Sequence, residues 1–360
     1  MARLQTQPRA RRRAVSARQL RGPLRLDRRT KLLVRRLRRG DVALIDHASL
    51  DRVSAEDLIA AGVAAVLNCG RSVSDAYPNV GPLLLAEAGV PLIELPDDSL
   101  FERCREGDRV AVAGGEVRRD GELLARGRPL AVEELRAAWR ERRALLGEAL
   151  ERFALNTIEH MREERELLGG RIALPRFATD FRERHALVVA RGSGYLEDLR
   201  SLRRYIRAAR PVIVAVDGAA EALLAEGLRP DMLVGDMDSA ADEALRCGAE
   251  LVVHAYPDGR APGRGRLEAL GLAHSLAAAP GTSEDLALLI AAEQGASLVV
   301  ALGPRLGLVE LLDRDRAGAA STILVRLRIG EILVDARGVS RLYGTRGGTG
   351  RAIARRLLAR

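Results

Sequence analysis

The chain has 360 residues, 47% of them hydrophobic and 30% charged, a length and composition typical of a folded protein with about two or three domains. Its formal net charge of +9 comes from one end. Residues 1–40 carry fifteen basic side chains and one acid, whereas the other 320 residues carry 43 basic and 48 acidic groups. This distribution argues against a nucleic-acid-binding surface over the whole protein.

The small numbers of lysine and cysteine residues exclude several kinds of functional site. The basic residues are 57 arginines and one lysine, Lys31, so beyond residue 40 no lysine is present for a P-loop, a Schiff base or a biotin attachment. The cysteines (Cys69, Cys104 and Cys247) form no CxxC pair, which argues against a zinc ribbon or a disulfide framework. No apolar run is long enough for a transmembrane segment or a secretory signal, and we therefore expect a cytoplasmic protein.

The N-terminal stretch, residues 1–25, has no hydrophobic period and is predicted to be a basic disordered arm. Two interpretations stay open for it. It is either a solvated tail or a segment that contacts anionic surfaces such as lipid, nucleic acid or an acidic partner.

Residues 26–130 are predicted to form an N-terminal β/α domain. Apolar strands separated by helices favour a parallel sheet, with strands at 42–45, 63–67 and 90–95 and helices at 54–61 and 82–88. Gly-Gly and Asp-Gly turns within 107–127 predict a small antiparallel insert.

Residues 131–170 carry the longest helical pattern. Apolar residues recur at intervals of three, four or seven up to residue 168, which predicts a helix about 57 Å long. Such a helix is either a brace between domains or the seam of a homodimer, and we expect a homodimer through residues 131–168.

A second β/α pattern covers residues 171–343. Strands are expected at 186–190, 212–216, 232–234, 251–254 and 298–302, with helices at 196–208, 219–225 and 283–293. This pattern predicts a doubly wound parallel sheet, whose ligands bind beyond the carboxyl ends of the strands. Residues 344–360 are predicted to be a flexible basic tail. The fold class is therefore α/β throughout.

The strongest chemical signal follows the strand at 232–234. Asp236 and Asp238 come directly after Gly235, which allows a sharp turn, and Ser239 is next. Carboxylates two residues apart offer the hard oxygen ligands that Mg²⁺ prefers. Asp217 ends the preceding strand, so that we expect it in the same crevice, where a divalent cation would relieve the repulsion between the acids. The alternative is that Asp217 only caps a turn or helix.

Further candidates lie near this crevice. Gly218 follows Asp217, and Thr282 and Asp285 begin the helix at 283–293. Asp285 adds a carboxylate or caps the helix, and Arg305 is a candidate for holding phosphate.

The first predicted domain has its own polar strand ends. Asp46 and His47 follow one strand, and Asn68 and Cys69 follow the next. His47 could act as a general base there, although a structural role explains these residues as well. Cys69 would be reactive only if its environment lowered the pKa of its thiol.

Two of these segments resemble a known family. Pro230–Ser239 and Ala215–Gly218 are similar to the catalytic domain of thiamine diphosphokinases, which transfer a diphosphoryl group from ATP to thiamine with Mg²⁺. The resemblance implies metal and catalytic roles for Asp236 and Asp238 and a catalytic role for Asp285. It also implies a nucleotide-binding set, consisting of Asp217, Gly218, Gly235, Ser239, Thr282 and Arg305.

A second resemblance covers nearly the whole chain. The chain resembles the SteA-like family, whose members are described as cytokinetic ring proteins. The segments that carry this resemblance include Leu26–Lys31, Gly40–His47, Tyr77–Pro82, Val253–Pro262 and Val334–Tyr343. This resemblance implies a role in cell division and envelope remodelling, with a membrane-protein partner and recruitment to the division site.

Three hypotheses follow. The chain is a division protein that binds Mg²⁺–nucleotide or a diphosphate, an active diphosphokinase that uses ATP and a small alcohol such as thiamine, or a non-catalytic dimeric scaffold.

Overall fold

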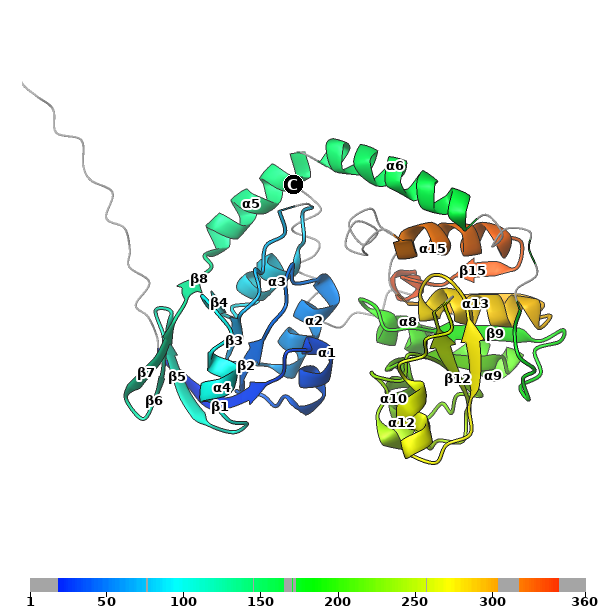
Figure 1. Ribbon diagram of the computed structural model, residues 1–360, viewed down its shortest axis with the longest axis horizontal. Coiled ribbons are helices and arrows are strands. Elements are labelled where there is room, and N and C mark those ends of the chain that lie inside the picture. The colour runs from blue at the N-terminus through cyan, green and yellow to red at the C-terminus, as the bar shows by residue number, and fades with distance from the viewer. Residues whose placement is uncertain are drawn as a thin grey trace, which may run out of the picture.

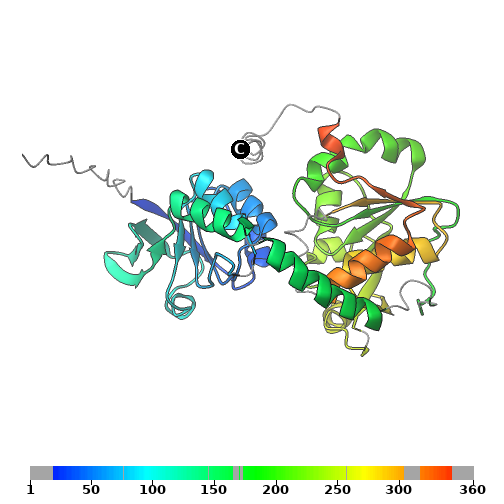
Figure 2. The same ribbon diagram turned by 90° about the horizontal axis from the view of Figure 1, so that it is seen from above.

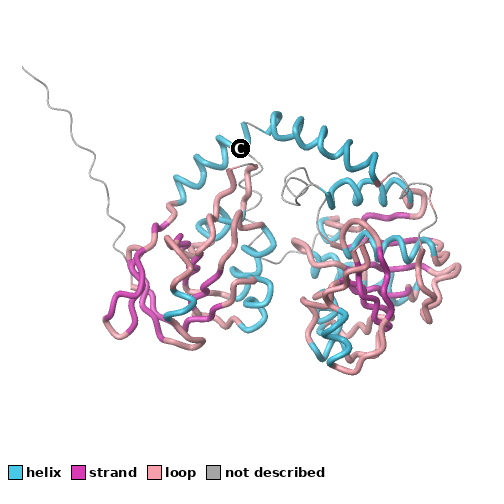
Figure 3. Tube along the Cα trace, viewed as in Figure 1, coloured by secondary structure: helices cyan, strands magenta, loops and turns pink. Residues whose placement is uncertain are grey.

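Two β-sheets organise the chain, as Figures 1 and 3 show. The computed structural model describes residues 19–75, 77–144, 146–164, 170, 173–256, 258–303 and 317–342. We call residues 19–144 the N-terminal unit and residues 146–342 the C-terminal unit. Most of the arm at 1–25, the tail at 344–360 and Arg305 lie outside the described residues. Within those ranges no helix combines the length and hydropathy needed to cross a membrane.

The N-terminal unit contains an eight-stranded sheet in the order β7-β6-β5-β1-β2-β3-β4-β8. Its strands are β1 (Leu20–Leu26), β2 (Val42–Ile45), β3 (Ala65–Asn68), β4 (Leu92–Glu94), β5 (Arg109–Ala113), β6 (Glu116–Arg119), β7 (Glu122–Arg126) and β8 (Arg128–Pro129). Strands β1 to β4 are parallel; the parallel arrangement of β2, β3 and β4 was predicted, and β5 to β7 form the predicted antiparallel insert.

Helices and an insert cover the two faces of this sheet. One core contains side chains of α1 (Thr30–Leu33), α2 (Arg52–Ala61), α3 (Gly81–Glu87) and α5 (Val132–Ala144), and the opposite core contains α4 (Leu100–Arg103) and the insert. A short 3₁₀ turn, η1 (Val34–Arg36), follows α1 directly.

Strand β1 corrects the prediction that residues 1–25 form a disordered arm. Residues 20–26 are a central strand, parallel to β2 and antiparallel to β5. The sequence analysis missed this strand because Leu20–Leu26 contains Gly, Pro and two Arg, and Leu24 is its only fully buried side chain. Gly22 is needed here, since a Cβ at this position would overlap the Gly40 carbonyl oxygen.

Most of the range predicted as one long helix, 131–168, is helical: helices α5 and α6 (Leu146–Glu163) lie on either side of residue 145, which is outside the described residues. Helix α5 packs against α3 in the N-terminal unit, and α6 packs against α15 (Ala317–Arg328) in the C-terminal unit. Figures 1 and 2 show them as an arch between the units. Leu135 of α5 belongs to a core of the N-terminal unit, and Met161 of α6 packs against a core of the C-terminal unit. The homodimer stays a prediction.

The C-terminal unit contains a seven-stranded parallel sheet in the order β13-β12-β11-β10-β9-β14-β15. Its strands are β9 (His185–Val189), β10 (Val212–Val216), β11 (Met232–Gly235), β12 (Glu250–Ala255), β13 (Ser275–Ala278), β14 (Leu298–Leu302) and β15 (Leu333–Asp335). The predicted α/β fold with a doubly wound parallel sheet is thereby confirmed. The sequence analysis missed β13, whose side chains are mostly exposed or half-buried, and the short edge strand β15.

Two layers of helices enclose the second sheet. Side chains of α13 (Ser283–Glu293) and α15 fill one face, and the other face is filled from α8 (Tyr195–Ser201), α9 (Arg203–Ala209), α10 (Ala219–Ala225), α11 (Asp242–Leu245) and α12 (Arg264–Ala269). A short 3₁₀ turn, η2 (Val339–Arg341), lies against α8. The helix predicted at 196–208 is divided into α8 and α9 at Leu202.

Candidate functional site

A cavity of about 350 Å³ lies between the two units. One wall is the carboxyl edge of the second sheet, where β9 and β10 end beside the N-terminus of α13, and the other wall is α1 and α2. The chain leaves β9 toward β10 and later returns on the opposite side of β9 as β14, so the cavity lies at the switch point of a doubly wound sheet. Ligands of open α/β sheets bind at such switch points. We call this cavity the cleft.

Three aspartates from neighbouring strand ends meet at the edge of the cleft, and Asp217 is the one that lines it. The Asp236 N–H donates to Asp217 Oδ1 (2.9 Å), and the Asp238 N–H donates to Asp236 Oδ1 (3.0 Å). Burial, followed by the negative charge of Asp236, raises the pKa of Asp217 to about 7, although Lys31 acts in the opposite direction. The sequence prediction that these residues converge is confirmed by their contacts.

The backbone explains why this sequence brings the carboxylates together. A Cβ at Gly235 would overlap the Asp217 carboxylate, so only glycine permits that approach. Met237 has a positive φ of 60° and is fully buried, which leaves Asp236 and Asp238 on either side of it toward solvent. Asp217 also has a positive φ, 47°, a conformation that Asp tolerates better than most residues.

Cations from the N-terminal unit face these acids. Arg29 Nη1 lies 3.1 Å from Asp238 Oδ2, and Lys31 Nζ lies 3.9 Å from Asp236 Oδ2. Lys31 belongs to α1 and lines the cleft, a role that the sequence did not indicate. The basic segment Leu26–Lys31 was the only signal that could have identified these residues.

A second group of contacts joins the two walls of the cleft. Arg191, which follows β9, forms an ion pair with Asp57 on α2, and Ser193 Oγ donates to Glu56 Oε1 (2.8 Å). Burial raises the pKa of the Asp57 carboxyl, and the Arg191 charge acts against this rise. Arg35 Nη2 lies 3.1 Å from Glu221 Oε1 at the same interface.

The start of α13 contributes neutral and acidic groups to the cleft. Thr282, Ser283 and Glu284 line it. Asp285 instead caps the helix: its Oδ2 accepts from the Thr282 N–H (2.9 Å), from Thr282 Oγ1 (2.7 Å) and from Thr322 Oγ1 (2.8 Å). The Asp285 side chain is 1% exposed, so the structure places it behind the cleft lining. Its catalytic role stays a prediction.

Sequence reasoning did not identify Glu284. Its side chain is 5% exposed, and its Oε1 accepts from Arg326 Nη2 (3.0 Å). Burial lowers the pKa of the Arg326 guanidinium, while the charge of Glu284 opposes this shift. A carboxylate within a run of eight buried helical residues gives no sequence pattern that separates it from the core.

The predicted polar residues of the first sheet are largely engaged with one another. Asn68 Oδ1 accepts from the His47 N–H (2.8 Å) and the Gly70 N–H (3.1 Å), and Asn68 Nδ2 donates to the His47 carbonyl oxygen (2.9 Å). His47 Nδ1 lies 2.8 Å from Thr30 Oγ1. Burial raises the pKa of the Cys69 thiol to about 12, so its environment does the opposite of what a reactive cysteine needs. Asp46 pairs with Arg28.

The donor set at the cleft fits Mg²⁺ held together with phosphate. No three His, Cys, Asp or Glu side chains within the described ranges are arranged to hold a metal ion by themselves. Mg²⁺ in phosphate sites, however, usually takes one or two carboxylates and completes its shell with water and phosphate oxygens. Asp217 and Asp236 provide such a pair. Gly218 and Ser239 also line the cleft, whereas the predicted phosphate ligand Arg305 lies outside the described residues.

Comparisons with known proteins give limited matches. No protein-family model matches the sequence, and no curated protein matches it either. Among solved structures, thiamine pyrophosphokinase from Bacillus subtilis is 20% identical with a TM-score of 0.26, over 42% of this chain and 61% of that chain. A 3-isopropylmalate dehydratase from Methanocaldococcus jannaschii is 11% identical with a TM-score of 0.23, over 36% of this chain and 98% of that chain. Both TM-scores are below 0.5, so neither likeness identifies the function of this chain.

Proposed function

We propose that the cleft binds the Mg²⁺ complex of a nucleotide or of another diphosphate. The observation that carries this proposal is the approach of Asp236 to Asp217 at the carboxyl edge of the second sheet: the Asp236 N–H donates to Asp217 Oδ1, and Asp217 lines a cavity large enough for a small ligand. Two carboxylates this close repel each other, as the raised pKa of Asp217 reflects. A divalent cation would remove that repulsion and would bring anionic ligand groups with it.

Each group at the cleft has a role in this proposal. Asp217 and Asp236 would hold Mg²⁺, which supplies positive charge to the phosphates. Asp238, which Arg29 now pairs with, lies one residue beyond the buried Met237 and would accept hydrogen bonds from metal-bound water. Ser283 presents a hydroxyl to the ligand at the start of α13, whereas the Thr282 hydroxyl already donates to Asp285 Oδ2 and would only line the cleft.

The cellular role that we propose comes from the SteA-like resemblance. In this role the protein binds nucleotide as part of the division machinery and is recruited by a membrane-protein partner, while the basic termini contact anionic surfaces. A homodimer through α5 and α6 is supported by apolar side chains of α6 that remain exposed, namely Leu150, Leu155 and Ile158.

Thermal unfolding with Mg²⁺ plus ATP, ADP or thiamine diphosphate tests the binding site. A ligand at a hundredfold its dissociation constant stabilises by about 2.7 kcal/mol, which corresponds to a shift of several degrees. We expect this shift in the wild type and its loss in Asp238→Asn. Asp258→Asn is the matched control, because Asp258 follows β12 and its carboxylate is bonded to Arg260, whereas Asp238 pairs with Arg29 and donates its N–H to Asp236 Oδ1.

The same samples distinguish binding from diphosphoryl transfer. An active diphosphokinase would release AMP from ATP when thiamine or another small alcohol is present. If ATP binds but no AMP is released, the bound nucleotide would regulate the assembly of the protein with its partners. Equal thermal shifts in wild type and Asp238→Asn would contradict the site assignment.

A further inference from the structure

Lys31 differs from the other cations at the cleft in how its charge is engaged. Arg29 and Arg35 each donate a hydrogen bond of 3.1 Å to a carboxylate of the C-terminal unit, and Arg191 is paired with Asp57. Lys31 Nζ lies 3.9 Å from Asp236 Oδ2, too far for a hydrogen bond, and its charge also acts on Asp217 without a hydrogen bond between them. Its three donors therefore remain available beside the cavity that Lys31 lines.

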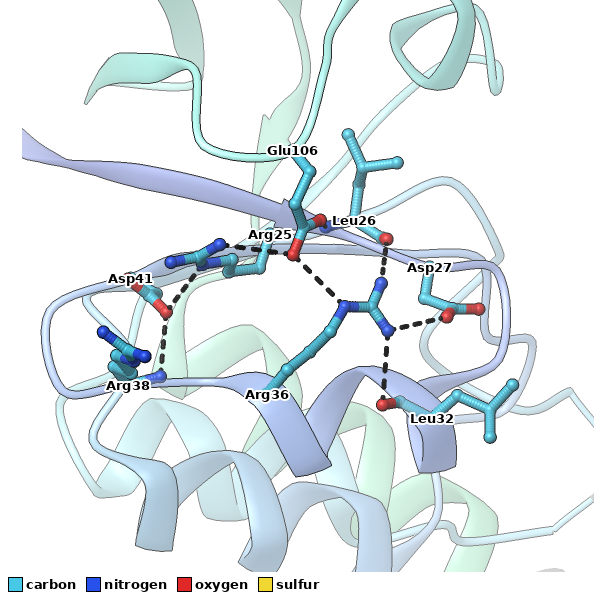
Figure 4. Close-up of polar contacts among 8 residues, drawn as sticks. All are labelled: Arg25, Leu26, Asp27, Leu32, Arg36, Arg38, Asp41 and Glu106. Carbon is cyan, nitrogen blue, oxygen red and sulfur yellow. Dashed lines mark hydrogen bonds and ion pairs between the residues drawn. The ribbon is translucent and has the colours of Figure 1, made fainter. Parts of the chain in front are cut away.

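The chain holds the Lys31 segment in place. Arg36 donates to the carbonyl oxygens of Leu26 (2.6 Å) and Leu32 (3.4 Å) and to Asp27 Oδ2 (3.0 Å), so one guanidinium fixes both ends of the turn from β1 into α1, as Figure 4 shows. The Arg29 N–H also donates to Asp27 Oδ1 (2.9 Å). This network fixes the backbone around Lys31 before any ligand arrives, which lowers the entropy that this segment loses on binding.

We propose that Lys31 is the phosphate-binding residue of the cleft, supplied by the N-terminal unit, so that one ligand bridges the two units. The inference rests on the proposed function, because it needs a phosphate beside the Asp217–Asp236 pair. A Mg²⁺ ion held by Asp217 and Asp236 would lie near the Lys31 ammonium and would repel it, and a phosphate that contacts both cations would remove that repulsion. A lysine serves here as a point charge with three rotatable donors.

The repulsion between the two cations predicts effects of opposite sign. Removing the Lys31 charge takes a competing cation away from Asp236, so a divalent ion alone should bind more tightly. A phosphate ligand should bind more weakly, because it loses its ammonium partner. If Lys31 only held the two units together, its removal would not change the affinities for the divalent ion and for the phosphate ligand in opposite directions.

Chemical labelling gives a direct test, since Lys31 is the only lysine in the chain. An amine-reactive acetylating reagent can modify Lys31 and the N-terminal amine alone, and cleavage after arginine places the label in the peptide Thr30–Arg35. The Lys31 side chain is 42% exposed in the free protein, so we expect ready labelling. Saturating magnesium tripolyphosphate should slow this labelling about tenfold or more.

Outcomes of this experiment separate the two proposals. Unchanged labelling of Lys31, while tripolyphosphate still raises the unfolding temperature, would overturn the role of Lys31 and leave the proposed function standing. No rise in unfolding temperature in the wild type with any Mg²⁺–phosphate ligand would overturn the proposed function itself.

Variants complete the test. We expect Lys31→Met to bind magnesium tripolyphosphate about tenfold more weakly than wild type and to bind Mn²⁺ alone at least as tightly, and Lys31→Arg to recover most of the phosphate affinity. Arg35→Met is the matched control, because it removes a cation from the same segment and the same interface without lining the cleft. Equal loss of affinity in Lys31→Met and Arg35→Met would contradict a specific role for Lys31.

Discussion

Each sheet presents polar residues at the carboxyl ends of its parallel strands, but the two edges use them differently. In the N-terminal unit, Asn68 is fully buried, and its amide bonds to His47, Gly70 and Ser72. In the C-terminal unit, Asp236 follows β11, and its half-exposed carboxylate lies 3.9 Å from the ammonium of Lys31, which lines the cleft. A polar residue at a strand end is therefore a candidate site only when the fold leaves its hydrogen-bonding groups available.

The difference follows from which backbone groups need partners. The loops after β2 and β3 have buried N–H and carbonyl groups that need hydrogen-bond partners. The Asn68 amide provides these partners, as buried polar groups require. In the loop after β11, the N–H groups of Asp236 and Asp238 donate to the carboxylates of Asp217 and Asp236. These bonds do not neutralise the negative charge of the three carboxylates. That excess charge is neutralised from the other unit by Arg29 and Lys31.

The largest expected effect concerns the first edge. Asn68→Ala would leave several buried partners without hydrogen bonds, which costs about 1–3 kcal/mol for each such group. We expect a fall of several degrees in the unfolding temperature, whereas Asp238→Asn, at a half-exposed site, should change it little. Thermal unfolding of both variants without ligand measures this contrast, and equal destabilisation would remove the distinction between the edges.

The second prediction concerns the charge on Asp217. Its pKa is raised from 3.8 to about 7, so the folded protein holds a proton that the unfolded chain has already lost between these pH values. Stability contributed by this group therefore falls as the pH rises through that window. Without divalent cations, Asp217→Asn should be more stable than wild type at pH 8, by on the order of 1 kcal/mol or more. The advantage should shrink toward pH 4, and a difference independent of pH would contradict the assignment.

The third prediction concerns positioning of the cations. Arg36→Met removes the hydrogen bonds that fix the turn before α1, and we expect magnesium tripolyphosphate to bind several-fold more weakly although the cleft lining is intact. Labelling of Lys31 in the free protein should change in rate, a readout that a general loss of stability would not give. Arg118→Met, in the antiparallel insert, is the control and should resemble wild type in both measurements.

The smallest expected effect is the absence of a reaction. A pKa of about 12 leaves only about one Cys69 thiol in ten thousand ionised at pH 8. Iodoacetamide should therefore leave Cys69 unmodified in the folded protein and modify it after unfolding in urea. Rapid alkylation of the folded protein would indicate that the first edge carries reactive chemistry after all.

Sequence patterns predicted local features well. The apolar strands β10 and β14 were located residue for residue, and Asp217, Asp236 and Asp238 were expected in one crevice because parallel strands place their ends together. β1 was missed because its Gly, Pro and Arg residues conceal a strand that is defined by pairing with β2 and β5.

The partners of the acids could not be predicted in this way. Arg29 and Asp238 are 209 positions apart, and no periodicity links residues that meet only when two separately folded sheets dock. Asp285 shows the converse limit: its spacing from Thr282 fits a capping box and a ligand site equally, and only the burial of the carboxylate distinguishes them.

Equilibrium dialysis of ATP tests the central claim most directly. Wild type and Asp236→Asn are dialysed against ATP, either with excess Mg²⁺ or with EDTA, and bound ATP is counted for each chain. We expect close to one ATP per chain in the wild type with Mg²⁺, and little in EDTA or in the variant. Equal binding by wild type and Asp236→Asn, or binding that persists in EDTA, would contradict a Mg²⁺–phosphate site at the carboxyl edge of the second sheet.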